Sequence, residues 1–152
     1  MAISRRKARG LRSMILPIIL DTAVIVAAMD KREKHHASAA AAMAGASPDR
    51  ILMPSTIMAE TMSFVRARYG LQYQRRVWDS LHASGIDIVA VGAELIAVAR
   101  EIDQAYADVG FGFADCTLLA TCEQEQVAKV LSLDRRLATY RPSFAAGLQL
   151  LP

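Results

Sequence analysis

The stretch Met14-Ile-Leu-Pro-Ile-Ile-Leu-Asp21 decides the fold of this chain. Its apolar part is short, rich in β-branched side chains and free of charge, which predicts a buried parallel strand over 14–20 with Pro17 tolerated near its start. Asp21 is then expected at the C-terminal end of that strand. Because ligand sites in open parallel sheets lie outside such strand ends, Asp21 is the first candidate site residue.

The rest of the chain alternates between short apolar runs and longer segments with helical periodicity. Further strands are predicted at 51–53, 86–91, 127–133 and, at an edge of the sheet, 148–151. Helices are predicted at 23–31, 35–46, 54–68, 71–83, 93–107 and 114–126, with Ser55 and Thr56 as capping candidates for the third. This alternation predicts an α/β fold, a three-layer sandwich with a central parallel sheet of four to five strands flanked by helices.

The charge of the chain is unevenly distributed. The 152 residues carry a formal charge of +3, but residues 1–13 contain five basic residues and no acid. Residues 14–152 therefore hold thirteen basic and fifteen acidic residues, a charge of −2. We expect residues 1–13 to be a basic, disordered tail and residues 14–152 to form one domain, which buries about two thirds of its unfolded surface.

The start of the chain also resembles a secretory signal, because the basic segment precedes the apolar residues 14–29. Asp21 interrupts that run, and a carboxylate at the centre of a spanning helix costs about 2.5–3.5 kcal/mol. Cys116 and Cys122 lie six positions apart on one predicted helix, so they point to different sides and are expected to stay reduced. We therefore expect a cytoplasmic protein with no membrane contact.

Four acids lie where carboxylates are unusual. Asp21 and Asp134 follow predicted strands, whereas Glu60 and Asp115 lie on or beside the apolar stripes of predicted helices. Each acid alone could be a helix cap or a solvated side chain, but the fold brings the ends of these elements together. Clustered carboxylates repel each other by about 4 kcal/mol per close pair, and their hard oxygens suit Mg²⁺ or Mn²⁺. Such clusters serve metal-dependent hydrolysis of phosphodiester bonds.

These acids stand in four segments that resemble the motifs of PIN domains, in order and with ordinary spacing: Leu20-Asp21-Thr22, Ala59-Glu60, Phe113-Ala-Asp115-Cys-Thr-Leu-Leu-Ala and Leu131-Ser-Leu-Asp134-Arg-Arg. The resemblance covers residues 14–150, and the size is most similar to VapC-type toxins of type II toxin–antitoxin systems. It implies an Mg²⁺- or Mn²⁺-dependent endoribonuclease in which Asp21 and Asp115 are the principal metal ligands. Glu60 would support the metal or its water, and Asp134 would complete the cluster.

The resemblance has further implications and two departures. Ser132 would form a hydrogen bond behind the metal ligands. An RNA substrate, a cognate antitoxin that inserts a peptide into the active site, and a homodimer are implied as partners. Ala23 stands where Ser or Asn is more usual, and Leu137 replaces a common aromatic residue. The basic tail is outside the family pattern, and is either an RNA-contacting arm or an extension before a true start at Met14.

Other functional candidates are weaker. Arg135 and Arg136 follow Asp134 directly and are candidates for binding the RNA backbone. The adjacent His35 and His36 diverge on a helix and cannot act as a ligand pair. Two alternative functions stay open, a non-catalytic PIN-fold module that binds RNA or protein, and a PIN nuclease of RNA processing without an antitoxin. A haloacid-dehalogenase type of phosphotransferase would need a second aspartate at the position of Ala23.

Overall fold

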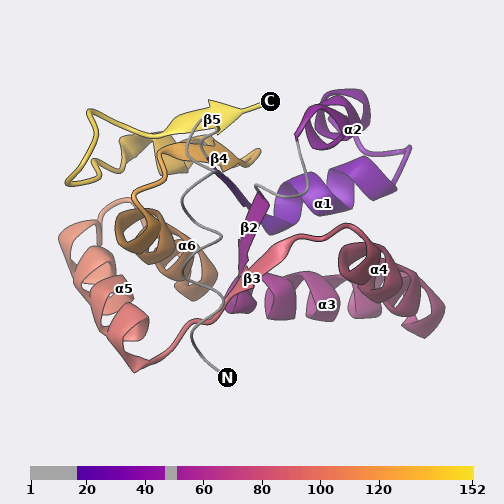
Figure 1. Ribbon diagram of the computed structural model, residues 1–152, viewed down its shortest axis with the longest axis horizontal. Coiled ribbons are helices and arrows are strands. Elements are labelled where there is room, and N and C mark those ends of the chain that lie inside the picture. The colour runs from indigo at the N-terminus through magenta and orange to yellow at the C-terminus, as the bar shows by residue number, and fades with distance from the viewer. Residues whose placement is uncertain (1–16, 47–50) are drawn as a thin grey trace, which may run out of the picture.

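A computed structural model describes residues 17–46 and 51–152. At its centre is a five-stranded parallel sheet with the order β3-β2-β1-β4-β5 (Figure 1). The strands are β1 (Ile18–Leu20), β2 (Ile51–Pro54), β3 (Asp87–Val89), β4 (Lys129–Leu131) and β5 (Gln149–Leu151). Ile19 of β1 is in register with Leu52 of β2 on one side and with Val130 of β4 on the other. The strand that precedes Asp21 is therefore the middle strand of the sheet.

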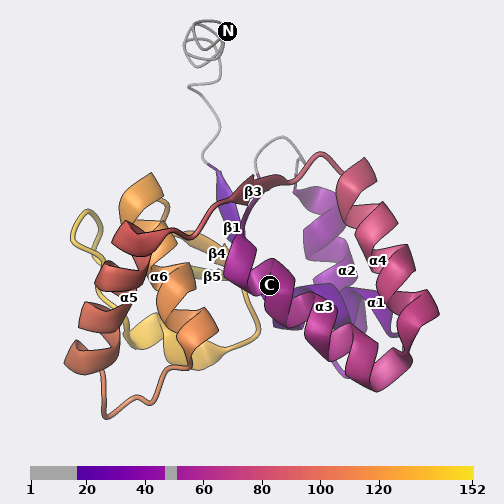
Figure 2. The same ribbon diagram turned by 90° about the horizontal axis from the view of Figure 1, so that it is seen from below.

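The helices form two layers around this sheet. They are α1 (Thr22–Met29), α2 (His36–Gly45), α3 (Ser55–Tyr69), α4 (Leu71–Ala83), α5 (Ala93–Ala105), α6 (Phe113–Glu125) and the short 3-10 helix η3 (Arg135–Thr139). Helices α1 to α4 connect β1, β2 and β3 and lie on one side of the sheet, whereas α5 and α6 connect β3 with β4 and lie on the other (Figures 1 and 2). The predicted three-layer α/β sandwich is confirmed.

All strands run parallel, but the direction in which the chain adds strands to the sheet reverses between β1 and β4. From β1 the chain moves outwards through β2 to β3, and it then returns past β1 to β4 and β5. The carboxyl ends of β1 and β4 therefore lie side by side at the point where the connections diverge, which is where open α/β sheets form their ligand crevices. The backbone N–H of Asp21 donates to the carbonyl of Leu131 at 3.0 Å and fixes these two ends together.

The core sits on both faces of the sheet. Ile19, Leu20 and Val130 have no exposed surface, as expected for central parallel strands. On α6 every residue from Cys116 to Cys122 is buried, because this helix is packed between the sheet and α5. Both cysteines are free, in agreement with the expectation of reduced thiols, and both are buried.

Several expectations need correction or fall outside the described part. Residues 1–13 and 14–16, the tail and the start of the predicted first strand, lie outside the described residues. Ser55 and Thr56 do not cap α3; the Ser55 hydroxyl accepts from the backbone N–H of Val91, and the Thr56 hydroxyl bonds the Thr117 hydroxyl at 2.6 Å. They connect α3 to its neighbours instead. Of the helices in residues 17–46 and 51–152, none is both long and apolar enough to cross a membrane.

Candidate active site

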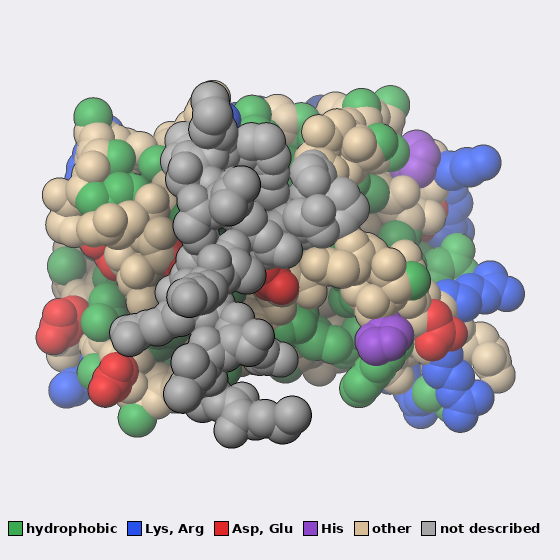
Figure 3. Space-filling view, viewed as in Figure 1, with side chains coloured by type: hydrophobic (Ala, Val, Ile, Leu, Met, Phe, Trp, Pro, Cys, Tyr) green, Lys and Arg blue, Asp and Glu red, His purple; other side chains and the backbone are tan. Residues whose placement is uncertain are grey.

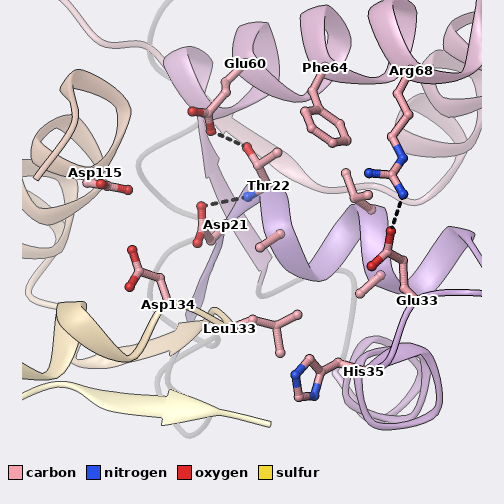
Figure 4. Close-up of a pocket in the computed structure, with 13 residues that line it drawn as sticks. Asp21, Thr22, Glu33, His35, Glu60, Phe64, Arg68, Asp115, Leu133 and Asp134 are labelled. Carbon is pink, nitrogen blue, oxygen red and sulfur yellow. Dashed lines mark hydrogen bonds and ion pairs between the residues drawn. The ribbon is translucent and has the colours of Figure 1, made fainter.

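A cleft of about 400 Å³ opens at the carboxyl ends of β1 and β4. Its walls come from α1, α3, α6 and the β4–η3 connection, and the side chains of all four predicted acids point towards its interior (Figure 4). The four are Asp21, Glu60, Asp115 and Asp134. The topology thus brings together carboxylates that are spread over more than a hundred residues of sequence.

Asp21 is the buried member of the set. It is only 5% exposed, its Oδ1 accepts from the backbone N–H of Thr22 at 2.7 Å, and its Oδ2 accepts from the Ser132 hydroxyl at 2.6 Å. Burial raises the pKa of Asp21 to about 6, and the charges of Asp115 and Glu60 add to the rise, while these two hydrogen bonds oppose it. The carboxylate is thus held in place by neutral donors, and no Lys or Arg of residues 17–46 and 51–152 forms an ion pair with it.

Ser132 connects the two strand ends chemically. Its side chain is fully buried one residue beyond β4, and while its hydroxyl donates to Asp21 it accepts from the backbone N–H of Asp134 at 3.0 Å. One hydroxyl therefore orients both the buried aspartate and the loop that carries the fourth acid. This is the contact with Asp21 that was expected for Ser132.

Glu60 lies on a different face of α3 from the one predicted. The buried face of this helix carries Ile57, Thr61 and Val65, whereas Glu60 is exposed and Phe64 is 40% exposed. The expectation that Glu60 lies on or beside a buried stripe with Ile57 and Phe64 is wrong, since only Ile57 of these three is buried. Glu60 faces the cleft, where its Oε2 accepts from the Thr22 hydroxyl at 2.7 Å.

Thr22 is a site residue that the sequence reasoning passed over. Its backbone binds Asp21, its hydroxyl donates to Glu60, and the Thr61 hydroxyl donates to it at 3.1 Å. Thr22 is buried in the first turn of α1, so it links that helix to α3 beneath the cleft. Its position directly after Asp21 in the first motif was the available signal.

Asp115 and Asp134 form the more exposed side of the cleft. Asp134 lies beyond the end of β4 and caps η3, because its Oδ1 accepts from the backbone N–H of Arg136 at 3.0 Å. Hydrogen bonds from Arg136 hold the pKa of Asp134 below its usual range. Asp115, in the first turn of α6, accepts from the backbone N–H of Gly112 through Oδ2 at 2.9 Å. Both acids thus also serve as local caps, as the alternative reading of single acids allowed.

The two arginines after Asp134 have different surroundings. Arg136 pairs with Asp134 at 2.6 Å and reaches Asp115 at 3.4 Å, whereas Arg135 points to the carbonyl of Pro152 at 3.1 Å. Farther along the cleft, Arg68 pairs with Glu33 at 2.8 Å beside His35. His36 is used structurally, with its Nδ1 2.9 Å from the carbonyl of Ala27.

The donor set fits a hard divalent cation. All four acids supply carboxylate oxygens, and among the described residues Asp115 Oδ1 and Glu60 Oε1 have no hydrogen-bond partner. Within the part of the chain that the structure describes, no three His, Cys, Asp or Glu side chains come close enough together to hold a metal ion. Coordination would therefore require these side chains to move towards each other.

The fold, the reversal point and the carboxylate-lined cleft define a class of α/β protein with an acidic site at the centre of its sheet. The PIN domain family matches residues 18–141, which include all four acids and most of the described chain. The chain therefore belongs to the PIN domain family.

Individual relatives are similar over nearly the whole chain. Ribonuclease VapC26 of Mycobacterium tuberculosis is 26% identical over 136 residues, which cover 89% of this chain and all of the relative. The crystal structure of VapC20 from the same species, a sarcin-ricin loop cleaving toxin, has a TM-score of 0.75 at 17% identity and covers 85% of this chain and 98% of its own. VapBC2 of Rickettsia felis, bound to a DNA fragment from its promoter, gives a TM-score of 0.67 at 16% identity, with 90% and 100% covered.

Proposed function

We propose that this chain is a metal-dependent endoribonuclease and the toxin of a toxin–antitoxin pair. The observation that carries the proposal is the convergence of four carboxylates in one cleft, one of them buried and held by neutral hydrogen-bond donors. A site of this composition suits an ion that can attract a phosphodiester. Similarity to a ribonuclease and to toxins supports the choice of RNA as substrate.

In this proposal Asp21 and Asp115 are the principal ligands of Mg²⁺ or Mn²⁺, Glu60 supports the ion or its water, and Asp134 completes the set. Bound there, the ion would activate water and stabilise charge on the phosphate oxygens. The protein's own contribution is orientation. Ser132 and the backbone of Thr22 fix both oxygens of Asp21, and the Thr22 hydroxyl fixes Glu60.

RNA would be held by basic side chains around the acidic cleft. Arg135 and Arg136 remain candidates for the RNA backbone, and Arg135 is the freer of the two because its only contact among the described residues is the carbonyl of Pro152. Lys and Arg side chains also gather on the edge of the molecule formed by the ends of α1, α3 and α4 (Figure 3). Phosphate contacts there would contribute affinity that falls with increasing salt.

Two protein partners belong to the proposal. A cognate antitoxin is supported by the structural neighbours that are toxin–antitoxin complexes. A homodimer would cover apolar side chains that stand exposed on α5 and α6, such as Ile96 and Phe113. The antitoxin is tested by sequencing the DNA that flanks the gene and co-expressing the chain with any short reading frame found there; co-purification and inhibition are expected. Light scattering measures the dimer.

The activity is tested with Asp21→Asn and Asp115→Asn on a structured RNA substrate in Mg²⁺ and in Mn²⁺. Each variant is expected to lose more than about a hundredfold in kcat/KM, because a ligand is removed and not merely reoriented. The fold is expected to survive, since each substitution relieves carboxylate repulsion. Asp79→Asn, an exposed aspartate on α4, is the matched control and should cleave like the parent protein. Wild-type cleavage by either site variant would refute the assignment, and RNA binding without cleavage by the parent protein would favour a binding module.

A further inference from the structure

Arg136 is held between two of the four acids by several contacts at once. Its Nε lies 3.0 Å from Oδ1 of Asp134 and its Nη2 lies 2.6 Å from Oδ2, which is the two-pronged geometry of a strong arginine–carboxylate pair. The same Nη2 is 3.4 Å from Oδ2 of Asp115. One guanidinium therefore bridges the carboxylate that caps η3 and a carboxylate on α6.

The backbone fixes this position of Arg136. Its Nη1 donates to the carbonyl of Gly110 at 3.2 Å, and its own backbone N–H donates to Asp134 at 3.0 Å. Arg135 differs in every one of these respects, since its guanidinium reaches only the carbonyl of Pro152 among the described residues. The two neighbouring arginines have the same charge, but only Arg136 is directed at the acids.

The contacts of Arg136 use oxygens that a metal ion would also need. Both Oδ2 atoms that it binds belong to proposed ligands, and a lone pair that accepts an N–H of Arg136 would not be available to a cation at the same time. While Asp134 and Asp115 are held by the guanidinium, they are spaced for an arginine and not for a small ion that demands short oxygen distances.

We propose that Arg136 is a built-in counter-ion that a divalent metal must displace from Asp115 and Asp134, so that this residue weakens metal binding and sets the metal concentration at which the site loads. The inference rests on the proposed metal-dependent function and concerns the regulation of the same site. The effect of Arg136 on metal affinity is expected to be small, because its side chain is 51% exposed and ion pairs at such positions are weak. Removing Arg136 is therefore expected to tighten metal binding about threefold to tenfold, not by orders of magnitude.

The test is calorimetric titration of the metal-free full chain with Mn²⁺, for the parent protein, Arg136→Gln and Arg135→Gln. Both variants lose one positive charge close to Asp134, but only Arg136 contacts the acids. Arg135→Gln therefore measures the general effect of losing a charge. We expect Arg136→Gln to bind Mn²⁺ about threefold to tenfold more tightly than the parent, and Arg135→Gln to stay within about twofold. A gain in affinity is the diagnostic result, because damage to a supporting contact would weaken binding.

A second measurement keeps the inference testable if Arg136→Gln is hard to purify. Arg136→Lys retains the charge but loses the two-pronged pairing, and it should bind Mn²⁺ with an affinity between those of the parent and of Arg136→Gln. The metal-dependent rise in unfolding temperature should follow the same order, since a ligand stabilises the folded state according to its affinity. Equal affinity of Arg136→Gln and Arg135→Gln, or weaker binding by Arg136→Gln, would overturn the inference while leaving the nuclease proposal intact. Failure of the parent protein to bind Mn²⁺ at all would overturn both.

Discussion

The two sides of the cleft stabilise their carboxylates differently, one with neutral hydrogen-bond donors and the other with an arginine. On the β1 side, Asp21 is buried and held by a hydroxyl and a backbone N–H, both neutral. On the α6 and η3 side, Asp115 and Asp134 are partly exposed and share the guanidinium of Arg136. Burial raises the pKa of Asp21 to about 6, whereas Arg136 keeps the pKa of Asp134 below its usual range.

The two sides of the cleft differ in how firmly their carboxylates are held and in how exposed they are to solvent. Neutral hydrogen bonds fix the geometry of Asp21 but cannot offset the cost of burying its charge, so this side of the site is strained electrostatically at neutral pH. On the other side, the charges of Asp115 and Asp134 are balanced by Arg136, and all three side chains are in contact with solvent. We infer that the β1 side supplies a metal ligand of fixed geometry and that the side with Arg136 regulates the binding of the metal ion.

Among the residues that support the proposed metal ligands, the largest effect is expected from the Ser132 hydroxyl that fixes Asp21. Ser132→Ala removes the donor to Asp21 and the acceptor for the N–H of Asp134, so kcat/KM for RNA cleavage should fall about 10- to 100-fold. Ser38→Ala on the exposed face of α2 is the control and should retain full activity. Activity of Ser132→Ala within twofold of the parent would mean that Asp21 needs no outer support.

A stability measurement tests the opposite electrostatics directly. As the pH rises from about 4 to about 6, the unfolded chain releases the Asp21 proton before the folded protein does, so the burial of this carboxylate costs stability above pH 6. In metal-free buffer, Asp21→Asn should therefore raise the free energy of unfolding at pH 7.5 by about 1 to 2 kcal/mol, and the gain should disappear near pH 4.

The companion variant on the other side should change stability with the opposite sign. The lowered pKa of Asp134 means that its carboxylate stabilises the folded protein at neutral pH, a contribution lost only as the pH falls below its usual value of 3.8. Asp134→Asn should lower the free energy of unfolding at pH 7.5 by no more than about 1 kcal/mol, because this ion pair is solvated. Urea unfolding of both variants measures the comparison, which fails if they shift stability in the same direction.

The smallest effect is expected at Thr22, whose hydroxyl links α1 to Glu60 on α3. Thr22→Val keeps the shape of the side chain but removes the donor to Glu60, so kcat/KM should fall about two- to fivefold. Thr22→Ser retains the hydroxyl and should restore activity. A loss larger than that of Ser132→Ala would place Glu60, and not Asp21, at the centre of the site.

The sequence was sufficient for the features that depend on local pattern and chain order. The apolar run before Asp21 and the alternation of strands and helices predicted the sheet, and the order of strands brought the four acids to one edge. The prediction for Glu60 was wrong because a helical repeat of Ile57, Glu60 and Phe64 looks the same whether that face meets a core or a cleft. The bridge made by Arg136 could not be predicted, since it depends on α6 and η3 meeting in space across 21 residues of sequence.

The burial of every residue from Cys116 to Cys122 on α6 makes the opening of this helix measurable. Cys122 has no exposed surface and burial raises its pKa to about 12, so at neutral pH it has almost no reactive thiolate while the helix is packed. Cys116 is buried on the same helix, directly beside Asp115. Alkylating reagents can modify these thiols only when α6 opens, and the modification rate therefore reports the opening equilibrium of the helix that carries Asp115. Cys116 and Cys122 are thus native probes of the local stability of the acidic site, and no label has to be introduced.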